Sequence, residues 1–532
     1  MANQESPSKN QKSTPSLIFN DDCSNFFYVY PADKVCAETV DEHVDGALAA
    51  GVGRFFCNTN AMRTNYDSEV WEPFWAGYDP DRGDDQEALR GMPLSELPKE
   101  RALLDSMLAL HKQGIDYPQR VLDRCRSRGV SPWVSIRMND AHDTQETNAP
   151  GQSTFWKEHP QYRRVPHDPS ARPNLALDYA HPQVRDHYRA LIEEHLERYD
   201  FDGLELDFMR HQYYFAIGRE LEGAKVLTQW LKPIRQLVRK RAEERGHPIK
   251  LAVRVASRPN TARRIGLDVA TWAREGLVDL VILGSSGYAT TTEFDMPVRL
   301  WRDLLAPYGV ELAGGIEPPT HRYTGTAQEV CTPEMATGSA MAILYGGADA
   351  VALFNYFLKF VLARRANWTR QQFEQTLSAM NSVAALDEGP RRHIVNYRET
   401  LAPGEIVPRN PWVLATKLGG ELAPIEYPLP AVGLDLAFRL QTGPKPVGRD
   451  VRVIIGLESD SECDVYRPSV RVNGVPCSAA DEKGEQGLFE FTVPEAAKAD
   501  EEHVVGICGN THVGGKFLKV TRVEFAVGPQ KA

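Results

Sequence analysis

The feature that most constrains the fold of this chain is a series of eight short apolar segments separated by stretches of helical pattern. The segments are rich in Val, Ile, Leu and Phe, as parallel strands buried on both faces are. Eight strand-then-helix units in succession predict a (β/α)8 TIM barrel of the α/β class. The predicted strands are residues 17–22, 54–60, 132–140, 202–210, 250–257, 279–286, 310–318 and 349–357.

A doubly wound parallel sheet is the competing α/β architecture. Such sheets usually carry a glycine-rich phosphate-binding loop after their first strand. The corresponding segment here, LIFNDDCSNFF, contains no glycine. The sequence therefore favours the barrel.

A second domain is predicted after the barrel. Seven prolines between residues 389 and 430 break any long element, and the segments beyond them alternate apolar and polar residues, as in LDLAFRLQ and RDVRVIIGLE. This pattern predicts a C-terminal antiparallel β-sandwich. The expected organisation is a disordered N-terminus at 1–16, a catalytic barrel at 17–388, a linker at 389–430 and the sandwich domain at 431–532. We expect the sandwich to have a structural role or to form a homo-oligomer interface.

Composition excludes several classes of function. The net charge is -11 and there is no basic block, which argues against nucleic acid and anionic membranes as partners. No apolar run approaches the ~20 residues that a membrane helix needs. The N-terminus, MANQESPSKNQKSTPS, lacks the apolar core of a secretory signal, so we expect a cytoplasmic location unless a leader was removed before this numbering.

Polar residues gather at the C-terminal ends of the predicted strands, whereas the strand beginnings are apolar. In a (β/α)8 barrel those C-terminal ends build the active site. The candidate residues at these positions are Asp22, Asn58, Arg137, Asn139, Asp140, His142, Glu205, Asp207, Arg210, Arg254, Glu317, His321, Asn355 and Tyr356.

The fourth predicted strand, in YDFDGLELDFMR, carries two carboxylates on one face. Side chains two residues apart in a strand point the same way, roughly 7 Å apart. If that face is the barrel interior, Asp207 lies at the mouth and Glu205 one layer deeper. A buried carboxylate needs a partner, and Arg137, Arg210 and Arg254 are available. A purely structural salt-bridge network is the alternative, above all for Glu205.

The seventh predicted strand ends in AGGIEPPTH, which contains Glu317. Two glycines before it allow a close approach to the backbone, and the prolines after it fix the loop. A solvated loop glutamate is the alternative. Facing Asp207 across the mouth, Glu317 would complete the pair of carboxyl groups that glycoside hydrolysis needs.

The remaining candidates suit a polyhydroxylated ligand. Arg137, Asn139 and Asp140 offer hydrogen bonds to sugar hydroxyls, with loop caps or turns as the alternative. Trp71 and Trp75, in the long loop after the second strand, would stack on sugar faces or pack within the loop. Histidines 142, 211 and 321 show no HxH or HExxH spacing, so we expect no metal and no cofactor.

The segment LDYAHPQVRDHYRALIEEHLERYDFDGLELDFMR resembles the glycosyl-hydrolase-like barrels of bacteria, where HPxVR…YDVDGIxLDxxR leads into the fourth strand. SIRMNDAH and the HPQY element at 159–162 look like the third βα unit of the same family. More distantly, the chain is similar to α-amylase-type barrels, whose nucleophile aspartate matches Asp207. Those barrels place their acid glutamate after the fifth strand, where this chain has AVRVAS. The role of Glu317 therefore rests on analogy with barrels that use strands four and seven.

The resemblance implies a carbohydrate substrate. We expect a glycoside hydrolase acting on an oligosaccharide or small glycoside, with Asp207 as nucleophile or base and Glu317 as general acid. The alternatives are a non-catalytic carbohydrate-binding barrel and a lyase or isomerase acting on a sugar acid. The arginines at the mouth also make a uronic or sulfated sugar conceivable.

Overall fold

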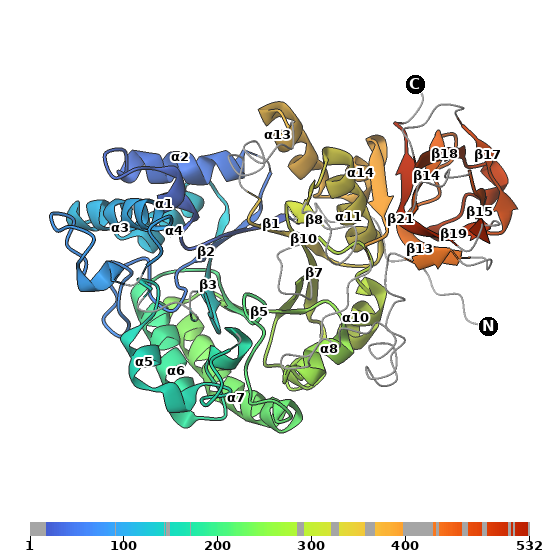
Figure 1. The fold of residues 1–532 in the computed structure, drawn as a ribbon. Helices are drawn as coiled ribbons and strands as arrows, with labels where there is room; N and C mark the ends of the chain where they lie inside the picture. Colours follow the sequence, from blue (N-terminus) through green and yellow to red (C-terminus); the bar gives the residue numbers. More distant parts are fainter. Residues whose placement is uncertain are drawn as a thin grey trace.

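The computed structural model describes residues 17–49, 51–90, 92–142, 144, 149–170, 172–284, 292–320, 329–356, 368–396, 429–431, 436–459, 467–480, 487–508, 512–513 and 516–529. Eight parallel strands close into a barrel in the order β1-β10-β7-β6-β5-β4-β3-β2 (Figure 1). This confirms the predicted barrel. Its strands are β1 (Leu17–Asp21), β2 (Arg54–Asn58), β3 (Ser131–Arg137), β4 (Gly203–Asp207), β5 (Lys250–Ala256), β6 (Leu280–Gly284), β7 (Glu311–Ile316) and β10 (Ala350–Phe354).

Helices surround the barrel, and several begin where the sequence supplies a cap. Asp116 accepts a hydrogen bond from the main-chain N–H of Gln119 at the start of α4, and Thr332 accepts one from Met335 at the start of α11. The longest helix ends at Gly246, whose φ of 74° favours glycine. The main helices are α2 (Ala37–Leu48), α3 (Leu97–Lys112), α4 (Tyr117–Ser127), α6 (Pro182–Arg198), α7 (Glu220–Arg245), α10 (Val298–Leu305), α11 (Pro333–Tyr345) and α13 (Arg370–Ala379).

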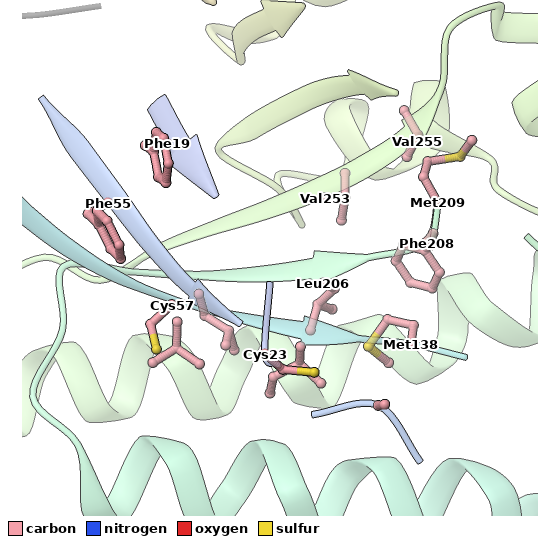
Figure 2. Close-up of a cluster of buried hydrophobic side chains, with 14 of the residues drawn as sticks. Phe19, Cys23, Phe55, Cys57, Met138, Leu206, Phe208, Met209, Val253 and Val255 are labelled. Atoms are coloured by element: carbon pink, nitrogen blue, oxygen red, sulfur yellow. The ribbon is translucent and has the colours of Figure 1, made fainter. Parts of the chain in front are cut away.

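Alternation along each strand separates two cores. Side chains such as Phe55, Leu206 and Val253 belong to the large core that includes the helices, part of which is drawn in Figure 2. The alternate residues fill the barrel interior, where Phe56 and Trp133 stack with ring centroids 4.6 Å apart. A Cβ on Gly203 would lie 2.3 Å from the Trp133 ring, so this indole requires the glycine of the DGLELD segment.

The C-terminal region forms two antiparallel sheets around a second apolar core, which confirms the predicted β-sandwich. Residues 391–394, which the sequence assigns to the linker, form strand β11 and pair with β21. The sandwich also contacts the barrel, because Arg439 of β13 lies 3.0 Å from both carboxylate oxygens of Asp295. The main strands are β11 (Arg391–Ile394), β13 (Leu436–Gly443), β14 (Val451–Ser459), β15 (Ser469–Val472), β18 (Leu488–Thr492), β19 (Glu501–Cys508) and β21 (Lys516–Val527).

Among the helices that the structure describes, none is long and apolar enough to cross a membrane.

Candidate active site

The barrel interior becomes polar above the Phe56–Trp133 stack, and Glu205 lies at this level. Its Oε2 accepts hydrogen bonds from Asn20 Nδ2 at 2.7 Å and from Ser135 Oγ at 2.5 Å. Arginine partners were expected, but no described arginine hydrogen-bonds to this carboxyl group. Burial and then the charge of Asp207 raise the pKa of Glu205 to about 8, so the group is protonated at neutral pH. A protonated carboxyl group is compatible with the neutral donors around it.

Asp207 ends β4 one layer above, as the alternation predicts. Its Oδ1 accepts a hydrogen bond from the main-chain N–H of Met209 at 2.7 Å, and its Oδ2 lies 3.3 Å from Arg254 Nη1. The parallel register places Asp207 between Arg137 on β3 and Arg254 on β5. The carboxylate is therefore oriented by a backbone donor on one side and a guanidinium on the other.

Glu317 follows the end of β7, and its side chain is only 5% exposed. The predicted alternative of a solvated loop glutamate is therefore wrong. Glu317 Oε1 accepts a hydrogen bond from Arg254 Nη2 at 3.1 Å. Its main-chain N–H donates to Thr292 Oγ1 at 2.9 Å, and the Thr292 hydroxyl hydrogen-bonds to its carbonyl oxygen. Thr292 thus fixes the backbone from which the carboxylate projects.

The two glycines before Glu317 are explained by close packing of the chain itself. A Cβ on Gly314 would meet Ile343 of α11 at 2.6 Å, and one on Gly315 would meet the carbonyl oxygen of Leu283 on β6 at 2.6 Å. Larger residues would push β7 away from its neighbours and move Glu317 with it.

Arg254 joins the two candidate catalytic carboxylates. Its two terminal nitrogens contact Asp207 and Glu317, and its guanidinium carbon lies 4.1 Å from the centroid of the Phe354 ring. The arginine is buried, and its pKa is raised, because the nearby carboxylates outweigh the opposing effect of burial. In the structure, Asp207 and Glu317 therefore both contact the guanidinium group of Arg254 at the mouth.

A second polar cluster lies at the same end of the barrel. Arg137 Nη2 lies 2.7 Å from Asp22 Oδ2, and Arg137 Nη1 lies 3.1 Å from Asp140 Oδ2. Asp140 Oδ1 accepts from His142 Nδ1 at 2.8 Å, and His142 Nε2 lies 3.0 Å from Arg210 Nη2. Burial alone would raise the pKa of Asp140, but His142, His211 and Arg137 hold it well below its ordinary value. Arg137 and Arg210 likewise lower the pKa of Asp22 against the effect of burial.

Asp140, His142 and His211 could supply three metal ligands, since one atom from each lies within 4.8 Å of the others. Both ring nitrogens of His142 are engaged, however, one with Asp140 and the other with Arg210. A metal ion would have to displace a guanidinium from this cluster. The absence of a metal stays a prediction, and His321, the third histidine of that hypothesis, lies outside the described residues.

Other predicted ligand-binding residues hold the protein together in this structure. The Asn139 amide donates to the carbonyl oxygens of Leu177 at 2.9 Å and Tyr213 at 2.6 Å, and Asn58 donates to the carbonyl of Ser135 at 3.1 Å. Both asparagines hold the backbone at the mouth, and Asn139 uses both of its side-chain N–H groups for this, so they are not available to a sugar.

The two tryptophans pack inside the loop after β2. Trp71 stacks on His187 of α6 with centroids 4.2 Å apart, and Trp75 stacks on His111 of α3 at 5.0 Å. Both are buried. The alternative of loop packing therefore describes these rings in the structure.

The last strand contributes Asn355 and Tyr356. Asn355 adopts a φ of 57°, the left-handed region, directly after β10. The Tyr356 ring is buried, and its hydroxyl has no hydrogen-bond partner among the described residues. These two residues remain candidates for contacts with a ligand.

Three residues that position the carboxylates were missed in the sequence, namely Asn20, Ser135 and Thr292. Asn20 stands two residues before Asp22, and Ser135 two residues before Arg137, so strand alternation carries a signal for both. Thr292 follows β6 by several residues, and nothing in its local sequence indicates its contact with Glu317.

Comparisons with known proteins show which family of barrels this chain resembles. Residues 95–320 match the family model described as Glycosyl hydrolase-like 10. The match covers less than half of the chain, but it contains Arg137, Asp207, Arg254 and Glu317. It confirms the resemblance to glycosyl-hydrolase-like barrels, whereas the distant similarity to α-amylase-type barrels stays a prediction. The chain therefore contains a glycoside hydrolase-like barrel.

No curated protein sequence matches this chain. Among solved structures, the PgaB (BpsB) glycoside hydrolase domain from Bordetella bronchiseptica matches at 11% identity and a TM-score of 0.39, over 68% of this chain and 99% of that one. The alpha-L-fucosidase from Vibrio sp. strain EJY3 matches at 10% identity and a TM-score of 0.36, over 98% and 97%. Chitinase ChiW from Paenibacillus sp. str. FPU-7 matches at 11% identity and a TM-score of 0.40, over 91% and 53%. Similarities this low say nothing of the substrate of this chain.

Proposed function

We propose that this chain is a glycoside hydrolase that cleaves a glycosidic bond in an oligosaccharide or small glycoside. The observation that supports this most is the meeting of Asp207 from β4 and Glu317 from β7 on Arg254 at the barrel mouth. Hydrolysis of a glycosidic bond requires two carboxyl groups of this kind. The cytoplasmic location and the oligomeric role of the sandwich stay predictions.

In this proposal Asp207 is the nucleophile or the base that activates water, and Glu317 is the general acid. Asp207 acts as an anion, which its contacts with Arg254 and the N–H of Met209 stabilise. Glu205 lies beneath it and supports the interior through Asn20 and Ser135, because its protonated carboxyl group is a poor nucleophile.

Glu317 needs a proton when it acts as acid, yet here it forms an ion pair with Arg254. Substrate entry between the two side chains would separate this pair, after which the carboxylate takes up a proton from solvent and transfers it to the leaving oxygen. Asp22, Arg137, Asp140, His142 and Arg210 would then contact sugar hydroxyl groups.

The test is a screen of wild type, Asp207→Asn and Glu317→Gln against aryl glycosides and oligosaccharides in both anomeric forms. We expect turnover by wild type and a loss of roughly 10³-fold or more in kcat/KM for Asp207→Asn. Glu311→Gln is the matched control, because Glu311 is a partly buried, ion-paired carboxylate at the start of β7, whereas Glu317 follows the end of that strand at the mouth. Equal turnover by wild type and Asp207→Asn would contradict the proposal.

The ion pair between Glu317 and Arg254 also favours a second candidate, a carbohydrate-binding barrel without catalysis. If Arg254 keeps the acid ionised permanently, no leaving group is protonated and the mouth only binds. Binding of a glycan by wild type and Asp207→Asn alike, with no turnover in either, would establish this second function.

A further inference from the structure

Of the three arginines predicted at the mouth, only Arg210 has no carboxylate partner among the residues that the structure describes. Arg254 forms ion pairs with Asp207 and Glu317, and Arg137 forms them with Asp22 and Asp140. Within the described part of the chain, no carboxylate oxygen lies within 4.0 Å of the Arg210 guanidinium nitrogens. The hydrogen bond that holds this side chain goes instead to a histidine.

The contact between Arg210 and His142 is a hydrogen bond to a ring nitrogen and not an ion pair. The main-chain N–H of His142 and its Nδ1 lie 2.9 and 2.8 Å from the same oxygen of Asp140. Because that oxygen can only accept, Nδ1 carries the hydrogen, and the lone pair of Nε2 accepts from Arg210. A polar chain therefore runs from Asp22 through Arg137, Asp140 and His142, and it ends on Arg210, which has no paired anion in the described part of the chain.

Arg210 is placed where a bound sugar could reach it. It follows Asp207 by three residues, a separation that extended chain spans in at most roughly 11 Å. Its side chain is half-buried, and its Nε is buried without a hydrogen-bond partner among the described residues. Its charge also acts on Asp22 at the mouth. Arg210 therefore lies close to Asp207 in the chain and in contact, through His142, with Asp140 at the mouth.

We propose that Arg210 is a specificity residue that binds the carboxylate of a sugar acid, so that the substrate is a glycan containing a uronic acid residue. This inference rests on the proposed function and names its substrate class. A planar guanidinium matches a carboxylate with two parallel hydrogen bonds, and His142 holds it in position.

The preference for an acid comes from direct contact and not from the overall charge of the mouth. Asp22, Asp140, Asp207 and Glu317 outnumber the three arginines, so an anion gains no long-range attraction. We therefore expect a moderate selectivity, roughly 10- to 100-fold in Kd between a sugar acid and its neutral counterpart, or about 1.4–2.8 kcal/mol.

The test measures binding in the Asp207→Asn protein, where turnover does not consume the ligand. Calorimetric titrations compare the methyl glycosides of D-glucuronic and D-galacturonic acid, in both anomeric forms, with the matching methyl glucosides and galactosides. We expect tighter binding of at least one acid than of its neutral partner. Arg210→Gln should abolish that preference, because it should lower the affinity for the acid far more than the affinity for the neutral sugar.

Two further variants separate the contact from general damage to the site. Arg219→Gln removes an exposed arginine that pairs with Glu222 at the start of α7, and it should leave the acid-to-neutral ratio unchanged. His142→Gln should lower that ratio less than Arg210→Gln does, because the guanidinium remains but loses its support. Thermal unfolding of each variant verifies folding, and the ratio itself is a readout that structural damage alone would not shift.

The outcomes also separate this inference from the proposed function. Equal binding of acid and neutral sugars, or a preference that survives Arg210→Gln, overturns the inference, even if wild type hydrolyses neutral glycosides. A preference for methyl 6-sulfo-glucoside over every uronic acid overturns the carboxylate assignment. An Arg210-dependent acid preference without any turnover by wild type supports the inference and counts against hydrolysis.

Discussion

The two ends of the barrel differ in how their buried carboxylates are paired with cations. At the N-terminal end, Glu311 is paired with two cations, Arg54 and Lys250, which lower its pKa below the ordinary value despite burial. At the mouth, Asp207 and Glu317 share the cation Arg254. Among the residues that the structure describes, two cations pair with one carboxylate at the N-terminal end, whereas two carboxylates contact one arginine at the mouth. This difference is what we expect between a stabilising site and a chemical one.

The largest expected effect comes from removing the shared cation. Arg254→Met removes the cation that two buried carboxylates share, and we expect the unfolding free energy to fall by about 3–5 kcal/mol. Arg54→Met is the counterpart at the other end, where Lys250 still pairs with Glu311, and the expected loss is about 1–2 kcal/mol. Urea unfolding of both variants measures the difference. Equal losses would mean that the two ends are electrostatically alike.

The next effect is a pH dependence that belongs to the mouth. The pKa of Glu205 is about 8 in the folded chain against 4.5 ordinarily, so the folded state holds more protons between these values. Its contribution to stability is complete below pH 4.5 and is lost as the pH rises through 8. From pH 6.5 to 8 we expect wild type to lose about 2 kcal/mol relative to Glu205→Gln. This window avoids the buried histidines, among them His195, whose pKa is lowered to about 4. If the urea midpoints of wild type and Glu205→Gln changed equally with pH, the raised pKa of Glu205 would be contradicted.

Removing one carboxylate should change stability in opposite directions at the two ends. Asp207→Asn relieves repulsion with the carboxylate of Glu317, which contacts the same arginine, so we expect a gain of up to about 1 kcal/mol. Glu311→Gln leaves Arg54 and Lys250 facing each other, and we expect a loss of about 1–2 kcal/mol. Denaturant midpoints at constant pH report both signs, and destabilisation by Asp207→Asn would show that its charge has a structural role.

The smallest effect is expected away from both ends, where the sandwich meets the barrel. Arg439→Gln breaks the contact with Asp295, but the arginine side chain is 51% exposed. Solvent screening limits such pairs to about 1 kcal/mol or less. A shift in the thermal midpoint much larger than that of an exposed control such as Arg219→Gln would indicate that this contact does more to hold the domains together.

The local sequence pattern was enough to predict the barrel strands, because each strand is a short apolar run, as expected for a parallel strand that is buried on both faces. Alternation also placed Glu205 below Asp207, and the strand ends located Arg254 and Glu317. The partners of Glu205 were not foreseen, since a carboxylate suggests an arginine when its own protonation state is unknown. Burial changed that state and made Asn20 and Ser135 suitable partners.

Aromatic residues in the long loops were the least predictable. Trp71 and Trp75 are residue types that often stack on sugar rings. In the structure they stack on His187 and His111 instead, and these histidines are distant from them in the sequence. Asn139 similarly reads as a ligand donor until the carbonyls of Leu177 and Tyr213 are seen beside it.

The most direct test of the account compares kcat/KM for the two ends of the barrel on whichever glycoside wild type hydrolyses. We expect Asp207→Asn and Glu317→Gln to lose roughly 10³-fold or more, while Glu311→Gln, although less stable, stays within about threefold of wild type. Retention of activity in Asp207→Asn, or an equal loss in Glu311→Gln, would contradict the assignment of the chemistry to the mouth.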